Sequence, residues 1–267
     1  LLGPSHQKGV VLYHPRSSSI TEALELISLW QTVENQNNFV LVIACGNNGT
    51  SYTEWTALCR TLASERLLPY KFVSYSIDEE LESELSFKDI FECIFYEQSS
   101  RFVERLAPVT LKRAHIKQPQ HLLITGGTGG IGKRIIEFMS PKRTTVVTRN
   151  LKNGPARRDG ENRTFIESNL ATLGLPTGEE YDVVVHCAGV VENALMASMN
   201  YSRFEKVCNP KSVGFATLLN GLKWKDPRLV VAASSVAAIL GSRGQANYAF
   251  ANGLMTTLAE MSESCTM

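Results

Sequence analysis

The strongest constraint on this chain is a glycine-rich segment, which reads Thr125-Gly-Gly-Thr-Gly-Gly-Ile-Gly132. It follows an apolar stretch, His121 to Thr125, and it precedes a stretch with helical spacing from about Ile131. A glycine-rich turn between a strand and a helix suits the pyrophosphate of a dinucleotide, because the helix N-terminus presents free N–H groups and a positive dipole. The segment therefore predicts a dinucleotide site, and a plain tight turn is the alternative.

The end of the next predicted strand, Thr144 to Thr148, distinguishes between two dinucleotides. An acidic residue there favours the free ribose hydroxyl of NAD, whereas an arginine accommodates the 2′-phosphate of NADP. The residue is Arg149, so we expect NADPH, with a solvated strand-end charge as the alternative. In the turn itself we expect the cofactor to contact Gly127, Thr128, Gly129, Gly130, Ile131 and Gly132.

The second half of the chain alternates between apolar runs of strand length and segments with helical spacing. Further near-continuous apolar strands are expected at Tyr181 to Ala188 and Arg228 to Ala233, as is typical of a sheet covered on both faces. Helical spacing recurs at Tyr201 to Leu222 and at Gln245 to Met261. This alternation predicts an α/β fold with a Rossmann-like, doubly wound parallel sheet.

The first half shows the same alternation without a glycine-rich phosphate turn. Its expected strands are Gly9 to Tyr13, Val40 to Ala44 and Phe72 to Ile77, and its expected helices are Ile20 to Gln31 and Tyr52 to Ser64. The segment Gly46-Asn-Asn-Gly49 is a turn signal only. With the polar stretch Lys112 to Gln120 as the boundary, we predict a structural, truncated Rossmann-like subdomain at residues 1–119 and an NADPH-binding catalytic subdomain at residues 120–267.

The bulk composition argues against several classes of function. With 43% hydrophobic and 20% charged residues and a net charge of +1, the chain lacks the field that would steer it to nucleic acid or to an anionic membrane. Its apolar runs are far shorter than a membrane span. None of its six cysteines forms a CxxC pair or has zinc spacing with histidine, so we expect reduced thiols, no metal and a cytoplasmic location.

Four polar residues downstream of the glycine turn form a candidate catalytic set. Ser235 follows a buried strand, Tyr248 stands at a helix start, and Asn252 lies one turn further on the same face. Lys211 follows Pro210 on the preceding predicted helix. Each residue alone has an ordinary explanation, as a cap, a half-buried aromatic, a polar helix position or a surface charge. Their joint presence after a dinucleotide turn favours catalysis.

These segments resemble the ketoreductase domains of modular polyketide synthases and animal-type fatty acid synthases, a branch of the short-chain dehydrogenase/reductases. In this branch the usual Tyr-x-x-x-Lys is replaced by Tyr-x-x-x-Asn, with the lysine on the earlier helix, as it is here. In the first half, Trp55 to Asp78 resembles the structural subdomain of these reductases. The matching motifs of the second half are the glycine turn, His186-Cys-Ala-Gly189, Asn209-Pro-Lys211, Ser234-Ser-Val236 and Gly244 to Asn252.

The resemblance implies a reaction and a set of roles. A hydride passes to the β-carbonyl carbon of a β-ketoacyl thioester, which an acyl carrier protein presents on its phosphopantetheine arm among neighbouring synthase domains. Tyr248 donates the proton, and Ser235 hydrogen-bonds the carbonyl oxygen. Because a free tyrosine has a pKa of about 10, a nearby cation must ease its proton loss, and Lys211 supplies that charge while Asn252 holds the proton relay. The cofactor is also expected to contact Asn169, Leu170, Ala188 and Gly189.

The sequence departs from the family pattern in several places. Asn169 stands where an aspartate is common, and the connection Ala171 to Glu180 is short. The family continues beyond the tyrosine helix with two strands and a helical lid, which we expect to be absent from this chain. The stereochemistry stays open, because Val191-Glu-Asn193 differs from the Leu-Asp-Asp of reductases that make the D-alcohol, and Leu240 replaces the tryptophan of the opposite class.

Two other functions remain open at this stage. A non-catalytic scaffold could keep the fold and the nucleotide, although all four catalytic residues are present. A free-standing reductase could act on a small ketone, although the additional first half argues against it. Activity confined to carrier-bound substrates would exclude the second alternative.

Overall fold

The computed structural model describes most of the chain. The described residues are 9–34, 39–46, 52–65, 68–86, 92–110, 117–149, 156–158, 162–173, 179–221, 229–262 and 265–266. The parts of the predicted segments that lie outside these ranges are residues 47–49 of the turn, residues 112–116 of the boundary stretch and residues 174–178 of the Ala171 to Glu180 connection. Along the described residues, no helix is both long enough and apolar enough to cross a membrane.

The chain folds into two compact units, and each is described by itself. The first comprises Leu1–Pro108, Glu192–Glu205 and Ser235–Thr257. The second comprises Val109–Val191, Lys206–Ser234 and Leu258–Met267. The predicted division at residues 119 and 120 falls between the two sheets, but two later segments of the chain belong to the first unit. The assignment of a structural role to residues 1–119 and a catalytic role to residues 120–267 stays a prediction.

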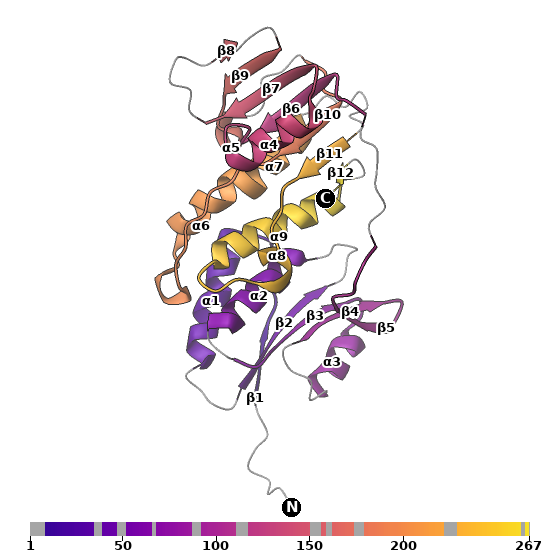
Figure 1. Ribbon diagram of the computed structural model, residues 1–267. Coiled ribbons are helices and arrows are strands. Elements are labelled where there is room, and N and C mark those ends of the chain that lie inside the picture. The colour runs from indigo at the N-terminus through magenta and orange to yellow at the C-terminus, as the bar shows by residue number, and fades with distance from the viewer. Residues whose placement is uncertain are drawn as a thin grey trace, which may run out of the picture. The chain divides into compact units, whose positions relative to one another are not determined.

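The first unit contains a five-stranded sheet with the order β1-β2-β3-β4-β5 (Figure 1). The first four strands are parallel, and β5 is antiparallel to β4. The strands are β1 (Gly9–Tyr13), β2 (Phe39–Gly46), β3 (Tyr70–Tyr75), β4 (Glu92–Glu97) and β5 (Ser100–Val103). The helical elements are α1 (Ile20–Glu34), α2 (Thr53–Glu65), α3 (Asp78–Ser86), the 3₁₀ turn η1 (Met196–Ser198), α8 (Ala237–Leu240) and most of α9 (Ala246–Glu260).

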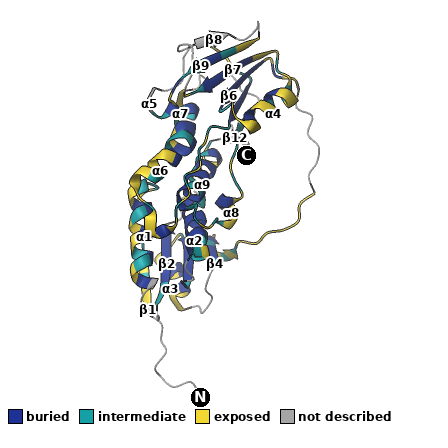
Figure 2. Cartoon of the chain, turned by 60° about the vertical axis from the view of Figure 1, so that its left-hand side comes forward, coloured by how far each residue is buried: buried dark blue, intermediate teal, exposed yellow. Residues whose placement is uncertain are grey.

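The core of the first unit forms because its central strands carry apolar residues on both faces. Most of β2 and β3 is buried, as Figure 2 shows for β2. The helices add aromatic contacts: Trp55 of α2 meets Phe250 of α9 nearly edge-on, with ring centroids 5.5 Å apart. Around the sheet, one buried apolar cluster consists of Val42, Ala44, Val73, Leu81, Ile94 and Tyr96.

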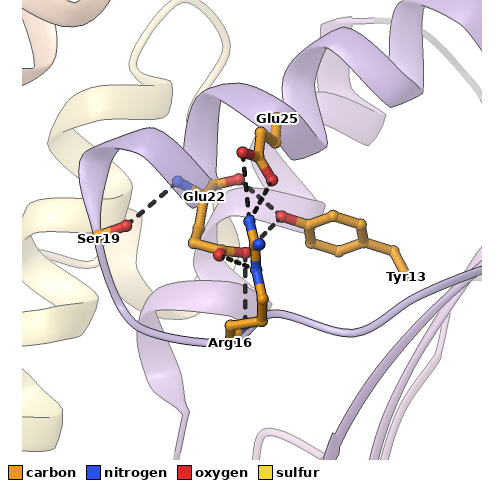
Figure 3. Close-up of polar contacts among 5 residues, drawn as sticks. All are labelled: Tyr13, Arg16, Ser19, Glu22 and Glu25. Carbon is orange, nitrogen blue, oxygen red and sulfur yellow. Dashed lines mark hydrogen bonds and ion pairs between the residues drawn. The ribbon is translucent and has the colours of Figure 1, made fainter.

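At the connection from β1 to α1, side chains form hydrogen bonds that cap and close the start of the helix (Figure 3). Ser19 precedes the helix, and its Oγ accepts a hydrogen bond from the Glu22 backbone N–H at 3.2 Å, which is an N-cap interaction. The buried Glu22 carboxylate accepts from the Tyr13 hydroxyl at 2.9 Å and from Arg16 Nε at 2.7 Å. Burial opposes ionisation of Glu22, but the hydrogen bonds from Tyr13 and Arg16 hold its pKa below the usual range.

The second unit contains a seven-stranded sheet with the order β12-β11-β10-β6-β7-β9-β8 (Figure 1). Its strand pairs are parallel except that β8 is antiparallel to β9. The strands are β6 (His121–Thr125), β7 (Arg143–Thr148), β8 (Ala156–Arg158), β9 (Arg163–Glu167), β10 (Val183–His186), β11 (Leu229–Ala232) and β12 (Cys265–Thr266). The helices α4 (Gly130–Met139), α5 (Leu170–Leu173) and α7 (Gly214–Gly221) belong to it. The predicted α/β fold with a Rossmann-like, doubly wound parallel sheet is confirmed. The expected absence of strands beyond the tyrosine helix is wrong in part, because β12 follows α9 and pairs with β11.

The predicted helix from Tyr201 to Leu222 is not regular. It consists of α6 (Tyr201–Cys208), a π-helical segment at Asn209–Val213, and α7. Pro210 lies at the start of the π segment and has no N–H to donate, and the Gly214 N–H bonds to the Asn209 carbonyl five residues earlier. This wider turn carries Lys211, so the lysine does not lie on an ordinary α-helix.

Candidate functional site

A cavity of about 290 Å³ lies in the second unit, at the carboxyl ends of β6 and β10. From β6 the chain continues to β7 on one side, whereas β10 pairs with β6 on the other side. Such a reversal of strand order is where doubly wound sheets bind their ligands. The cavity is lined by Thr125, Gly126, Thr128, Gly129, Val147, Thr148, Arg149, Ser168, Asn169, Leu170, Ala171, Cys187, Ala188, Gly189 and Pro210.

The turn after β6 requires glycine at two positions. Gly126 has a φ of +68°, and a Cβ added there would lie 2.8 Å from the backbone N of Ala188. A Cβ on Gly132 would lie 2.5 Å from the carbonyl oxygen of Gly126. Side chains at these positions would collide with backbone atoms, so the turn packs directly against the start of α4 and against the loop after β10.

The N-terminus of α4 opens without a side-chain cap. Its N-cap residue is Gly129, at φ −79° and ψ 171°, which has no side chain that could cap the helix. A Cβ on Gly130 would meet no atom within 4 Å. The first turn of α4 therefore presents backbone N–H groups and the positive end of the helix dipole to open space.

The far wall of the cavity comes from the ends of β7 and β9. Arg149 directly follows β7, is exposed and lines the cavity. Ser168 and Asn169 follow β9, and Asn169 Oδ1 accepts a hydrogen bond from the Ala171 N–H at 3.3 Å at the start of α5. A guanidinium and short polar side chains therefore stand on the side of the cavity opposite the loop after β10.

His186, the last residue of β10, links the cavity wall to Lys211. Its Nε2 lies 3.1 Å from the Lys211 carbonyl oxygen, and its Nδ1 lies 2.8 Å from Thr125 Oγ1. A carbonyl oxygen only accepts, so Nε2 carries the proton and Nδ1 accepts from the Thr125 hydroxyl. Thr125 Oγ1 in turn accepts from the Ala188 N–H at 3.2 Å. Burial and the charge of Lys211 lower the pKa of His186 to about 4, which keeps the ring neutral.

Lys211 has its ammonium group buried against the same loop. Its Nζ donates to the Ala233 carbonyl oxygen at 3.0 Å. A Cβ on Gly189 would lie 2.9 Å from Lys211 Cε, so the glycine leaves room for the lysine chain beside the cavity. Burial lowers the pKa of Lys211 to about 8, which brings its titration close to neutral pH.

The other three predicted catalytic residues lie in the first unit. Ser235 precedes α8, and its Oγ accepts from the Ala237 N–H at 3.2 Å. Tyr248 lies in the first turn of α9 and packs against a small cluster of alanines that includes Ala237. Asn252 is fully buried and donates from Nδ2 to the Tyr248 carbonyl oxygen at 2.7 Å. Its Oδ1 has no hydrogen-bond partner among the described residues.

The predicted residues thus fall into three groups. Of the expected cofactor contacts, those that line the cavity are Thr128, Gly129, Arg149, Asn169, Leu170, Ala188 and Gly189. Gly127, Gly130, Ile131 and Gly132 lie in the same turn and helix without lining it. Lys211 belongs to the second unit, whereas Ser235, Tyr248 and Asn252 belong to the first. In the part of the chain that the structure describes, no cluster of His, Cys, Asp or Glu could hold a metal ion.

Sequence reasoning missed part of the cavity wall. Thr125, Ser168, Cys187 and Pro210 also line it. Each is next to a residue that was predicted, because a strand end or turn contributes neighbouring residues to one edge. The role of His186 was missed altogether, since its two partners are far away in the sequence.

Comparison with known proteins points to one family. Residues 177–266 match the family model described as the KR domain. Among curated relatives, the polyketide synthase GfsA of Streptomyces halstedii is 29% identical over 164 residues, which cover 52% of this chain and 2% of that protein. The chain thus spans only a small share of the length of such relatives.

Solved structures share the fold. The first ketoreductase of the tylosin polyketide synthase is 20% identical, with a TM-score of 0.74 over 96% of this chain and 65% of that chain. The ketoreductase PlmKR1, from the first module of phoslactomycin biosynthesis in Streptomyces sp. HK803, is 20% identical, with a TM-score of 0.72 over 98% and 70% of the two chains. At this identity the likeness concerns the fold alone.

Proposed function

We propose that this chain reduces a β-ketoacyl thioester to the β-hydroxyacyl thioester with NADPH. The proposal is supported by the KR domain match over residues 177–266 and by the similarity to polyketide synthases and to the fold of solved ketoreductases. The observation that carries the proposal is the cavity at the switch point of the second sheet. The N-terminus of α4 and Arg149 line this opening, and the buried Lys211 lies directly beside it, next to Gly189.

The residues of this cavity fit a dinucleotide phosphate. The glycine turn leaves no side chain between the backbone and a ligand, and the start of α4 offers N–H donors to a pyrophosphate. Arg149 suits the 2′-phosphate of NADPH, because its planar guanidinium can pair with two phosphate oxygens. Asn169 and Leu170 would hold the adenine end, and Ala188 and Gly189 would leave room for the nicotinamide end.

When bound, NADPH supplies a hydride, and the protein must supply a proton to the carbonyl oxygen. In our proposal Tyr248 donates that proton and Ser235 hydrogen-bonds the same oxygen. Lys211 supplies the positive charge that eases proton loss from the tyrosine, since its lowered pKa of about 8 leaves most of it charged at neutral pH. The unpaired Oδ1 of Asn252 can accept a hydrogen bond from a water that replenishes the proton.

The proposed substrate arrives on an acyl carrier protein, attached through a phosphopantetheine thioester. This partner and the neighbouring synthase domains are proposals that rest on the multidomain synthases to which the chain is similar. Simple thioesters of β-keto acids serve as substrate surrogates.

The test compares the wild-type protein with Tyr248→Phe, using NADPH oxidation with a β-ketoacyl thioester and a separate NADPH titration. Removal of a general acid typically lowers turnover by about 10²–10⁴-fold, and we expect this loss with unchanged NADPH affinity. A wild-type protein that binds NADPH without turnover would favour a scaffold role. Failure to bind NADPH would overturn the cofactor assignment. Equal turnover of small ketones would favour a free-standing reductase.

A further inference from the structure

The C-terminal half of α2 binds the backbone that leads into the tyrosine helix α9. Arg60 donates from Nη1 to the Ile239 carbonyl oxygen at 2.6 Å, and Thr61 Oγ1 accepts from the Ser242 N–H at 3.0 Å. The two helices also approach closely, because a Cβ on Gly253 of α9 would lie 2.5 Å from the Glu54 Cα. A helix of the predicted structural subdomain thus holds the segment that precedes Tyr248, and all of these residues lie in the first unit.

Glu65, the last residue of α2, binds two separate loops with one carboxylate. Its Oε2 accepts from the Met196 N–H at 2.6 Å, and its Oε1 accepts from the Gly244 N–H at 3.0 Å. Met196 begins the 3₁₀ turn η1, whereas Gly244 lies just before α9. Hydrogen bonds from backbone N–H groups to a charged acceptor are stronger than those between neutral groups, so each oxygen of Glu65 fixes one loop.

The two loops are also bonded to each other. The Ala194 N–H donates to the Gly244 carbonyl oxygen at 2.9 Å, and Gln245 Nε2 donates to Asn193 Oδ1 at 3.0 Å. Asn247 Nδ2 donates to the Glu192 carbonyl oxygen at 2.9 Å. The segment 192–196 and the segment 244–247 thus form one short bonded layer, which Glu65 fastens to α2.

This layer ends at the proposed proton donor. Asn247 Oδ1 accepts from the Tyr248 N–H at 2.8 Å, so the side chain that reaches segment 192–196 also fixes the start of α9. A shift of Gly244 relative to segment 192–196 would therefore move the first turn of α9 and the tyrosine with it. Misplacement of a catalytic group by about 1 Å can lower a rate by about a hundredfold.

We propose that Glu65 is a positioning residue for the reduction, which acts through segments 192–196 and 244–247 on the place and orientation of Tyr248. The inference rests on the proposed function, because it concerns the same reaction. It gives the first half of the chain a part in catalysis beyond support of the fold. Because Tyr248 would protonate a ketone held in one orientation, we expect its displacement also to lower the stereochemical purity of the alcohol.

The test compares Glu65→Gln with Glu82→Gln, which removes an exposed carboxylate from α3 of the same unit. Glutamine keeps the size of the side chain but replaces one acceptor oxygen with an NH₂ group, which cannot accept from a backbone N–H. In assays of the whole protein, we expect Glu65→Gln to lower kcat about tenfold and to raise the share of the minor alcohol enantiomer. NADPH affinity should not change, and Glu82→Gln should match the wild type.

Amide hydrogen exchange provides a readout that does not depend on activity. Glu65→Gln should speed exchange at Met196 and Gly244 while the strands of both sheets stay protected. If Glu65→Gln does not fold, Thr61→Val removes a neighbouring acceptor with little change of shape, and we expect the same changes at smaller size.

Three outcomes would overturn the inference. The first is a Glu65→Gln protein with wild-type kcat and enantiomer ratio. The second is unchanged exchange at both amides. The third is a parallel fall of NADPH affinity, kcat and unfolding temperature, which would indicate general destabilisation. An inactive wild-type protein would overturn the proposed function instead, and hydrogen exchange would still decide whether Glu65 fastens the two loops.

Discussion

In each sheet, the strand that comes first in sequence leads into a helix. The N-termini of these two helices differ, because one has a side-chain cap and the other has glycine at its N-cap. From β1 to α1, Ser19 caps the helix, and the Glu22 carboxylate collects hydrogen bonds from Tyr13 and Arg16 (Figure 3). From β6 to α4, the N-cap is Gly129, which has no side chain to cap the helix. The first helix start is filled by protein groups, whereas the second is left open to a ligand.

The two sheets also differ in strand order, and again only the second sheet has the feature that suits ligand binding. In the first unit the described strands follow one another in sequence order, so no reversal of order opens a crevice among them. In the second unit the order reverses between β6 and β10, and the cavity lies there. A doubly wound sheet needs both an open helix start and a switch point to bind a dinucleotide. The first sheet has neither feature at β1, which fits a supporting role for that sheet.

Among the substitutions that test this contrast between the two sheets, the largest effect is expected from a methyl group in the glycine turn after β6. Gly132→Ala places a Cβ about 2.5 Å from a backbone carbonyl oxygen, so the turn must move. Overpacking of this kind costs about 1–3 kcal/mol, and we expect NADPH binding to weaken by about a hundredfold. Fluorescence titration of NADPH measures the change.

The control for this substitution comes from the first sheet. Gly46 ends β2, and a Cβ there would meet nothing within 4 Å. Gly46→Ala should leave NADPH affinity at the wild-type value. If both alanine variants bind NADPH equally well, the glycine turn does not hold the cofactor.

A smaller effect on NADPH affinity is expected from a substitution that gives α4 a side-chain N-cap, as Ser19 does for α1. Gly129→Asp places a carboxylate at the N-cap, where it accepts from the N–H groups and repels the pyrophosphate. We expect NADPH affinity to fall about tenfold to thirtyfold, since about 1.4–2 kcal/mol of interaction is lost. Thermal unfolding without NADPH should be unchanged or slightly improved. Gly129→Ser, which adds no charge, should bind NADPH more tightly than the aspartate variant does.

The third prediction concerns the pH dependence that Lys211 brings to the second unit. Its pKa is lowered from 10.5 to about 8, so the folded protein loses this proton at lower pH than the unfolded chain does. If the charge assists Tyr248, turnover falls as pH rises through about 8, by up to about tenfold for each pH unit. Lys211→Met should be slow at every pH and should lack this step.

The lowered pKa of Lys211 also makes the stability of the folded protein depend on pH. Between pH 8 and pH 10.5 the unfolded chain binds more protons at Lys211 than the folded protein does, so stability rises with pH over this range. Urea unfolding at several pH values should show this rise in the wild type and a smaller one in Lys211→Met. Identical pH profiles of the two proteins would show that the pKa of Lys211 is not lowered in the folded protein.

The elements that could be predicted from the sequence are those with a strong local signal. The strand His121–Thr125 and its glycine turn were located correctly, because the apolar run is continuous and the turn residues are specific. Helix α3 and strands β4 and β5 were not predicted, since Asp78–Ser86 is rich in glutamate and Glu92–Glu97 has charged ends. The π-helical segment at Lys211 was also not predicted, because the spacing of apolar residues does not distinguish a π turn from an α turn.

Long-range contacts account for what local patterns could not predict. In sequence, residues 235–257 lie between β11 and β12 of the second sheet, but they join the first unit, where α2 packs against α8. The bonds of Glu65 to Met196 and Gly244 span more than a hundred residues, and no periodicity signals them. Motif spacing thus identified the candidate residues, whereas the groups that hold them came only from the fold.

The smallest effect is expected at the closed helix start of the first unit. Ser19→Ala removes the acceptor for the Glu22 N–H, and loss of such a cap costs about 1 kcal/mol of unfolding free energy. Because the closed connection has no part in the cavity, NADPH affinity should not change. The control is Ser28→Ala, the same substitution at an exposed position inside α1, where alanine is the better helix former. Urea unfolding should separate the two variants, with only Ser19→Ala less stable than the wild type. Equal stability of both variants would show that the cap contributes nothing, and weaker NADPH binding by Ser19→Ala would show that the two connections are not independent.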